Sequence, residues 1–592
     1  MNSSRKNRFK KVVFAISLSW LLIALTPSFS SVAEESDEEC PYHKAIREAE
    51  KAGAKDIEPP SVAAEQKRET AHSHHSTEPA HPTAVASHPC HDIQGIPRWL
   101  FLFGGAFVLV GTAGVAAVRK KVALASVEKE SRLDILAIKP LGDLVKKPYF
   151  QILVQIPVLF LFALVLATGL FGSTYKNFAP VFTWTIWWGL LVFIVLFFGK
   201  AFCAVCPWDA VAGILQRFSL FKRRLPLLSR GLKLPKWARN IYPASLLFIG
   251  LTWLELGFGV TRNAPATAIL GLLMLALTVI SALVFERRSF CRYACLIGRI
   301  SGLYAMFAPI ELRRRNAHTC SSCLGKDCAV GNDKGMACPT FEFPARLERN
   351  TYCTLCTECV RACPHDNIGI YLRPFGEDLK NEATFRKDEA HLAVILLALT
   401  SFHGLTMIPT WFSLTDWVQE ALDIGYKTAF SLLMALCVIL PILLFLGVAK
   451  LSDIFTGRQK SAPLIFSAFA FPLVPIALFY HLAHNVMHFF REAQMLFPIL
   501  SDPFGWGWNL FGTSGLDYQP LLSLDTIWYV QTFLILAGHI FGIILSERTA
   551  RLLFQRKRDV WLAQIPMLIV MILFSLYSLW LIHQPMEMRT GM

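Results

Sequence analysis

The chain has 592 residues, of which 54% are hydrophobic and only 17% are charged. This composition excludes an ordinary soluble protein, and several stretches approach the ~20 apolar residues that a helix needs to cross a bilayer. The net charge of +15 does not indicate a nucleic-acid partner, because basic residues of a membrane protein usually mark its cytoplasmic loops. We therefore predict an all-α polytopic protein of the bacterial inner membrane.

The N-terminus, residues 1–33, has the pattern of a signal peptide. Basic residues precede the short apolar segment Val12–Leu25, and the small residues that a signal peptidase requires end at Ala33. We expect cleavage after Ala33, and an uncleaved anchor is the alternative. In both cases the chain from residue 34 onward begins outside the cytoplasm.

Residues 34–96 form a polar, Pro-rich and His-rich periplasmic segment in which we expect no packed core. Its imidazole and thiol groups suit copper or zinc. The candidate ligands are His72, His74, His75, Cys90 and His91. A disulfide between Cys40 and Cys90 is an equally weighted alternative, because this compartment is oxidising.

Ten apolar stretches follow and predict about ten transmembrane helices. They divide into a first bundle within residues 97–310 and a second within residues 390–592. The expected ranges are 98–118, 149–172, 181–199, 241–260, 264–284, 391–410, 427–449, 463–488, 526–545 and 560–582. Loops rich in Lys and Arg follow the first, third, fifth and ninth stretches, so the positive-inside rule assigns these loops to the cytoplasm. The mature N-terminus and the C-terminus are then both periplasmic.

The insert between the bundles, residues 311–375, contains two cysteine runs. The second run, C-x2-C-x2-C-x3-C-P, matches the bacterial ferredoxin pattern, in which the fourth cysteine binds the other cluster. The first run has the looser spacing C-x2-C-x4-C-x9-C-P. We therefore expect a small α+β ferredoxin-like insert with two [4Fe–4S] clusters. One is assigned Cys320, Cys323, Cys328 and Cys363, and the other Cys353, Cys356, Cys359 and Cys338. Structural zinc, which usually takes two paired ligand knuckles, is the alternative.

Two further cysteine pairs follow apolar helices on the same predicted side of the membrane. They are Cys203 with Cys206, and Cys291 with Cys295, and all four thiols could converge. A third metal site, a redox-active dithiol and an incidental arrangement are all open. The repetition of the pair favours a redox or metal role, with the ligand set undecided.

This ordered set of cysteine motifs among membrane spans resembles the NapH/NosR/CcoG-type membrane polyferredoxins. The resemblance covers about residues 145–370. It implies electron transfer between membrane quinol, cytoplasmic-side clusters and periplasmic metalloenzymes or their maturation. The chain departs from the family at Leu296, where a proline is usual, and in the gaps of its first run. Residues 34–96 are also too short for the flavin-binding domain of NosR-like members, so the resemblance implies no flavin here.

Histidines in the second bundle are the remaining candidates. His403, His481, His484, His488 and His539 lie in predicted spans, where ionisable residues indicate function. A haem b held by two of them would carry electrons across the part of the bilayer that the clusters do not cover. A quinol pocket that uses His and Glu492 as proton acceptors is a second interpretation, and simple hydrogen bonding between helices is a third.

Together these features predict a respiratory electron-transfer protein that links the quinone pool, the clusters and a periplasmic redox protein or reductase, as one subunit of a larger complex. If it is an enzyme, it is a quinol dehydrogenase component, although the sequence identifies no catalytic residue. The alternative is a maturation factor that delivers copper or electrons to a periplasmic metalloenzyme through the His-rich segment.

Overall fold

A computed structural model describes residues 92–117, 132–174, 176–221, 230–380, 385–516 and 520–587. The chain divides into two compact units. In the smaller one, the described part is an antiparallel pair of short strands, β1 (Asp92–Ile93) and β5 (Met586–Glu587). All further structure belongs to the larger unit, Gly95–Pro585. The predicted signal peptide and the candidate periplasmic ligands His72, His74, His75, Cys90 and His91 lie outside the described residues.

The first half of the larger unit consists of apolar helices whose ends are set by capping residues. The side chain of Asn177 accepts a hydrogen bond from the Ala179 amide, and that of Asn263 accepts one from the Ala266 amide. Helices α6 and α12 pack along each other. The helices are α4 (Arg98–Ala117), α5 (Lys139–Lys146), α6 (Phe150–Phe171), α7 (Phe178–Pro180), α8 (Trp188–Phe198), α9 (Ala201–Val205), α10 (Pro207–Phe221), α11 (Tyr242–Gly257), α12 (Ala264–Val284) and α13 (Leu296–Tyr304).

The second half is a bundle centred on α21, whose side chains are almost all buried against α23, α17 and α8. This burial explains why polar residues on α21 need partners within the protein. The helices are α17 (Lys387–Leu405), α18 (Pro409–Leu422), α19 (Tyr426–Phe455), α20 (Ala462–Phe469), α21 (Leu473–Glu492), α22 (Leu496–Ser501), α23 (Leu524–Leu553) and α24 (Lys557–His583).

Seven of the described helices are long and apolar enough to cross a membrane, or eight if the bent pair α17 and α18, which meet at 92°, forms one span. The protein is therefore a multi-pass membrane protein, as predicted, but the count of ten spans is not confirmed. Helices occur at all ten expected places. However, α11 has only 16 residues, or about 24 Å at 1.5 Å per residue, and falls short of the ~30 Å hydrocarbon core.

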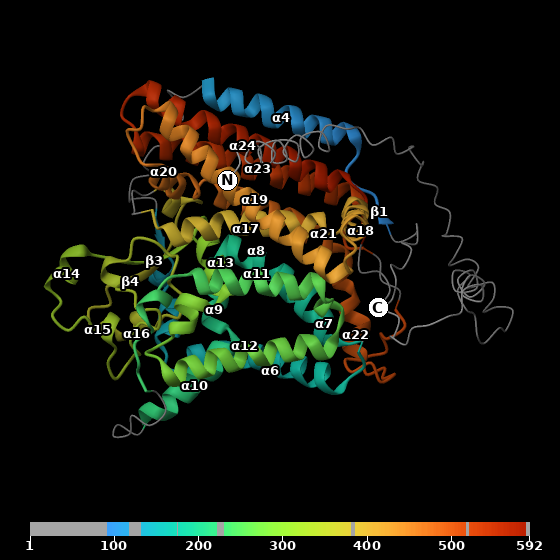
Figure 1. The fold of residues 1–592 in the computed structure, drawn as a ribbon. Coiled ribbons are helices and arrows are strands. Elements are labelled where there is room, and N and C mark those ends of the chain that lie inside the picture. The colour runs from blue at the N-terminus through green and yellow to red at the C-terminus, as the bar shows by residue number, and fades with distance from the viewer. Residues whose placement is uncertain are drawn as a thin grey trace. The chain divides into compact units, whose positions relative to one another are not determined.

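A small module of strands and short helices lies beyond the ends of the membrane helices (Figure 1). Its antiparallel sheet has the order β2-β4-β3, with β2 (Leu133–Asp134), β3 (Ile310–Arg314) and β4 (Ile368–Leu372). The register pairs Leu312 with Ile370. Helices α14 (Ala317–Ser322), α15 (Asp327–Val330) and α16 (Glu358–Ala362) complete the module. Its apolar core includes two cysteines, Cys328 and Cys359.

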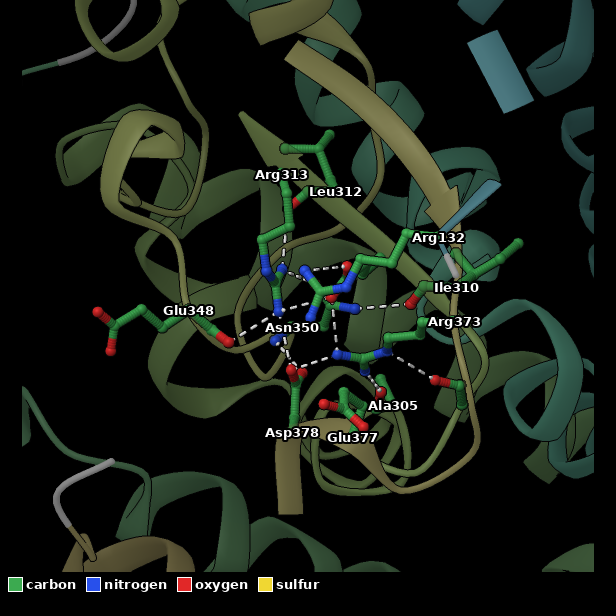
Figure 2. Close-up of polar contacts among 12 residues, drawn as sticks. Arg132, Ala305, Ile310, Leu312, Arg313, Glu348, Asn350, Arg373, Glu377 and Asp378 are labelled. Atoms are coloured by element: carbon green, nitrogen blue, oxygen red, sulfur yellow. Dashed lines mark hydrogen bonds and ion pairs between the residues drawn. The ribbon is translucent and has the colours of Figure 1, made fainter. Parts of the chain in front are cut away.

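A buried network of charges joins this module to the end of α13. Arg373 pairs with Glu311 at 3.0 Å and with Asp378, while Arg313 donates to Asp378 at 2.8 Å. Figure 2 shows Asp378 facing both guanidinium groups. Arg373 also donates to the carbonyl of Ala305, directly after α13. The network therefore holds the sheet in a defined position relative to α13, whose N-cap is Cys295.

Candidate iron–sulfur site

The first cavity of the module is lined by the four cysteines of the first assigned set. These cysteines are Cys320, Cys323, Cys328 and Cys363. Cys320 lies in α14, Cys323 and Cys363 directly follow α14 and α16, and Cys328 lies in α15. Asn367 donates from its side-chain amide to Cys320 Sγ at 3.1 Å and from its backbone N–H to Cys363 Sγ at 3.3 Å. Such N–H···S bonds stabilise thiolates that bind iron.

The second cavity is lined by Cys338, Cys353, Cys356 and Cys359. The chain between these cysteines winds tightly, because Leu355 and Thr357 have φ values of 54° and 61°. Burial raises the pKa of Cys353 and of Cys356 to about 12. These thiols therefore keep their protons at neutral pH unless a bound metal displaces them.

The arrangement of the cysteines around the two cavities favours a cluster over a single ion. A structural zinc ion needs four ligands converging on one point, with sulfur about 2.3 Å from the metal. Among the described residues, no three His, Cys, Asp or Glu side chains converge in that way. Four thiols around an open volume instead fit a cubane, whose four irons each take one cysteine. The residues present thus fit a [4Fe–4S] cluster in each cavity.

A third cavity is lined by two further cysteine pairs, Cys203 with Cys206 and Cys291 with Cys295. Cys206 ends α9 and Cys295 caps α13, where its sulfur accepts a hydrogen bond from the Gly298 amide at 3.4 Å. Cys291 lies in a π-helical turn, Phe290–Ala294, a distortion that is frequent at functional sites. Burial raises the pKa of Cys206 and of Cys295.

The second and third cavities share part of their walls. Pro339, Thr340 and Thr354 line both of them. Cys359 of the second cavity and Cys328 of the first belong to one apolar core. The three sets of cysteines therefore form a continuous series, with the second set in the middle.

Two buried cations border the third cavity, and the sequence analysis did not single them out. Lys200 lines the cavity, and Arg299 follows Cys295 by one helical turn; each is 1% exposed. Burial, together with the charge of Arg299, lowers the pKa of Lys200 to about 8. The sequence could have indicated these two residues, because each is a basic residue that lies close to a cysteine motif within otherwise apolar sequence.

Of the five candidate histidines, His403, His484 and His488 come together between α17 and α21. The ring centroids of His403 and His484 are 4.9 Å apart, and those of His484 and His488 are 4.8 Å apart. His488 Nδ1 lies 3.1 Å from a carboxylate oxygen of the buried Glu492. Three imidazoles and a carboxylate thus form a continuous polar group within the bundle.

The other two histidines lie apart from this group. His481 Nδ1 lies 3.3 Å from the hydroxyl of Tyr304, the last residue of α13. His539 has both ring nitrogens engaged, with Thr112 Oγ1 at 2.9 Å and Ser575 Oγ at 2.8 Å. The predicted set of five is therefore divided into three places.

These histidines, as arranged, do not fit a haem held by two axial imidazoles. The porphyrin plane must lie between the two axial rings, whereas the rings of His403 and His484 are in contact. His539 would have to give up one of its two hydrogen bonds to bind iron. We therefore derive no role for haem.

Comparisons with known proteins support the iron–sulfur assignment. A family model described as a 4Fe-4S binding domain matches residues 180–227 and 267–316. A protein of Escherichia coli (strain K12), YccM, named as a candidate electron transport protein, is 29% identical over 196 residues, which are 30% of this chain and 52% of YccM. The chain thus spans about half the length of that relative. No solved structure matches the chain.

The chain is similar to iron–sulfur electron-transfer proteins of the membrane. This supports the predicted iron–sulfur binding and electron transport at a general level. The assignment to the NapH/NosR/CcoG type goes beyond these matches. The matched family segments contain all four cysteines of the third cavity and end at residue 316, before the first ferredoxin run.

Proposed function

We propose that the protein carries electrons between membrane quinol and a periplasmic redox partner through [4Fe–4S] clusters on the cytoplasmic side. The observation that supports this proposal most directly is the pair of cavities in one module, each ringed by four cysteines. Cys320, Cys323, Cys328 and Cys363 would hold one cluster, and Cys338, Cys353, Cys356 and Cys359 the other. Each cluster would accept and release one electron at a time.

The group of His403, His484, His488 and Glu492 is the proposed quinol site. Oxidation of a quinol releases two electrons and two protons, so the site needs proton acceptors as well as an electron acceptor. Histidine and glutamate are suited to this task. Thr185 Oγ1 donates to the other carboxylate oxygen of Glu492 at 3.4 Å, which keeps that side chain directed at the group.

The test is a reduction experiment on protein purified without oxygen. A reduced quinol analogue is added, and optical and low-temperature EPR spectra are recorded together. A cluster signal that appears with quinol would support the proposal. If dithionite reduces the clusters and quinol does not, quinol oxidation is wrong, and a cytoplasmic electron donor or a maturation role becomes the better explanation.

Replacing Glu492 with glutamine should slow cluster reduction by quinol by about 10²-fold, the usual contribution of a positioned proton acceptor. The amide keeps the shape of the side chain but cannot take up a proton. The matched control is Glu420→Gln, the same change at an exposed site on α18. The rate is measured by stopped-flow absorbance at several pH values.

Reduction by dithionite should proceed equally in both variants, because it needs no proton acceptor. An unchanged quinol rate in Glu492→Gln would remove this residue from the proposed site.

A further inference from the structure

A chain of aromatic rings leads from the third cavity to the histidine-bearing helix α21. Phe202 and Trp208 line this cavity. The ring centroid of Trp187 lies 5.5 Å from that of Phe202 and 6.0 Å from that of Trp208. Trp187 lies 6.0 Å from Trp188, and Trp188 lies 6.4 Å from His481. Each step falls within the range of about 4.5–7 Å that is typical of contacting aromatic rings, so the chain has no gap.

The two ends of this aromatic chain are the two sites already described. His481 and His484 both lie in α21, and residues three apart share one face of a helix. His484 contacts His403 and His488 in the proposed quinol site. At the other end, the matched family segments contain all four cysteines of the third cavity, which supports an iron–sulfur cluster there. The aromatic chain therefore joins a proposed electron donor site to a site for a one-electron acceptor.

A distorted helical segment carries side chains to both ends. Val181–Trp187 is π-helical and continues into α8 at Trp188. Thr185 of this segment donates to Glu492 in the proposed quinol site. Trp187 contacts the two rings that line the third cavity, whereas the next residue, Trp188, contacts α21. Helical turns of this kind are rare and occur frequently at functional sites, so the distortion favours a functional role for the side chains that it positions.

We propose that Trp187 and Trp188 form the electron route between the proposed quinol site and the iron–sulfur site of the third cavity. The rate of electron tunnelling falls steeply with the gap between donor and acceptor, and π-systems in contact shorten that gap. Oxidation of one quinol sends two electrons along this route, one after the other, and each reduces an acceptor by one electron. The two protons go to the acceptors of the histidine group. The tryptophans are unchanged after each transfer.

This inference rests on the proposed function, and its test measures electron transfer in both directions. Trp188→Leu removes the ring beside His481 and keeps an apolar side chain. Reduction of the clusters by a quinol analogue and oxidation of the reduced clusters by the matching quinone should both become several-fold slower, by the same factor, in stopped-flow absorbance. The midpoint potentials and the Kd of the quinone should not change, because the route alters neither end. Trp188→Phe keeps a ring and should restore most of the rate.

A second variant and a matched control exclude a general packing effect. Trp187→Leu interrupts the same route nearer the third cavity and should slow both directions in the same way. Trp184→Leu is the control, because Trp184 belongs to the same π-helical segment and its ring lies 6.5 Å from that of Trp188. Its indole nitrogen donates to Thr267 of α12, and it is not among the residues that line the third cavity. Its rates should stay close to those of the wild type.

The possible failures give different results. Unchanged rates in Trp188→Leu and Trp187→Leu, or equal slowing in Trp184→Leu, would overturn the electron route and leave quinol oxidation in place. A slower rate that is accompanied by a changed potential or a weaker Kd would also overturn it, because the substitution would then act on one of the two ends. If quinol does not reduce the clusters of the wild-type protein, whereas dithionite does, both the route and the proposed function are wrong.

Discussion

Replacing Cys359 with serine is expected to remove about four iron atoms per chain, because the second cavity loses one of its four ligands. Cys359 is 7% exposed and lies in the apolar core that also contains Cys328. The hydroxyl of serine is a poor iron ligand compared with a thiolate. Loss of this cluster interrupts the middle of the series of cysteine sites, so electrons should no longer pass from one end to the other.

The measurement combines iron analysis with EPR of the dithionite-reduced protein. One cluster signal should disappear, and any broadening from interaction between neighbouring clusters should vanish with it. Cys437→Ser provides the control for a thiol-to-hydroxyl change elsewhere in the chain. A Cys359→Ser protein with full iron content and an unchanged spectrum would show that this residue is not a ligand.

Replacing Asp378 with asparagine should destabilise the attachment of the module by about 3–5 kcal/mol, the usual effect of removing one partner from a buried ion pair. Asp378 accepts from Arg313 at 2.8 Å and from the amide of Asn350 at 2.7 Å, and it pairs with Arg373. Without its charge, two buried guanidinium groups share the single carboxylate of Glu311, which is also paired with Arg132.

Hydrogen exchange of the β3 and β4 amides is the readout, since it reports on the module separately from the membrane helices. Exchange should accelerate in Asp378→Asn. Glu348→Gln is the control, because Glu348 joins the network through its backbone carbonyl alone, while its carboxylate points away (Figure 2). Equal exchange in the two variants would mean that the network does not hold the module.

The two sets of cysteines could be assigned from spacing alone. In the ferredoxin pattern, the fourth cysteine of one run is a ligand of the cluster that the other run holds. The same four-cysteine sets line the two cavities of the structure. Helix positions also followed from sequence, because long apolar stretches have few alternatives in a membrane. Helix length was less predictable, and α11 ends after 16 residues.

The features that sequence reasoning missed depend on contacts between distant segments. Strand β2 comes from residues before α6, yet it pairs with β4, more than 200 positions later. Lys200 and Arg299 gain their importance from burial, which no local pattern shows. The sequence analysis treated His481 as a candidate alongside His484 and His488, but Tyr304 of α13 engages His481 separately.

The exchange of cysteines between the two ferredoxin runs has a consequence for biogenesis. The second cavity takes Cys338 from the first run and is complete only when synthesis has passed Cys359. The first cavity lacks one of its four cysteines until Cys363, four residues later, has also been synthesised. Neither of the two proposed clusters could therefore have its full ligand set while the first run alone has emerged from the ribosome. Both proposed sites would become complete almost simultaneously, just before the second helical bundle is made, so that one delivery event could serve the whole module.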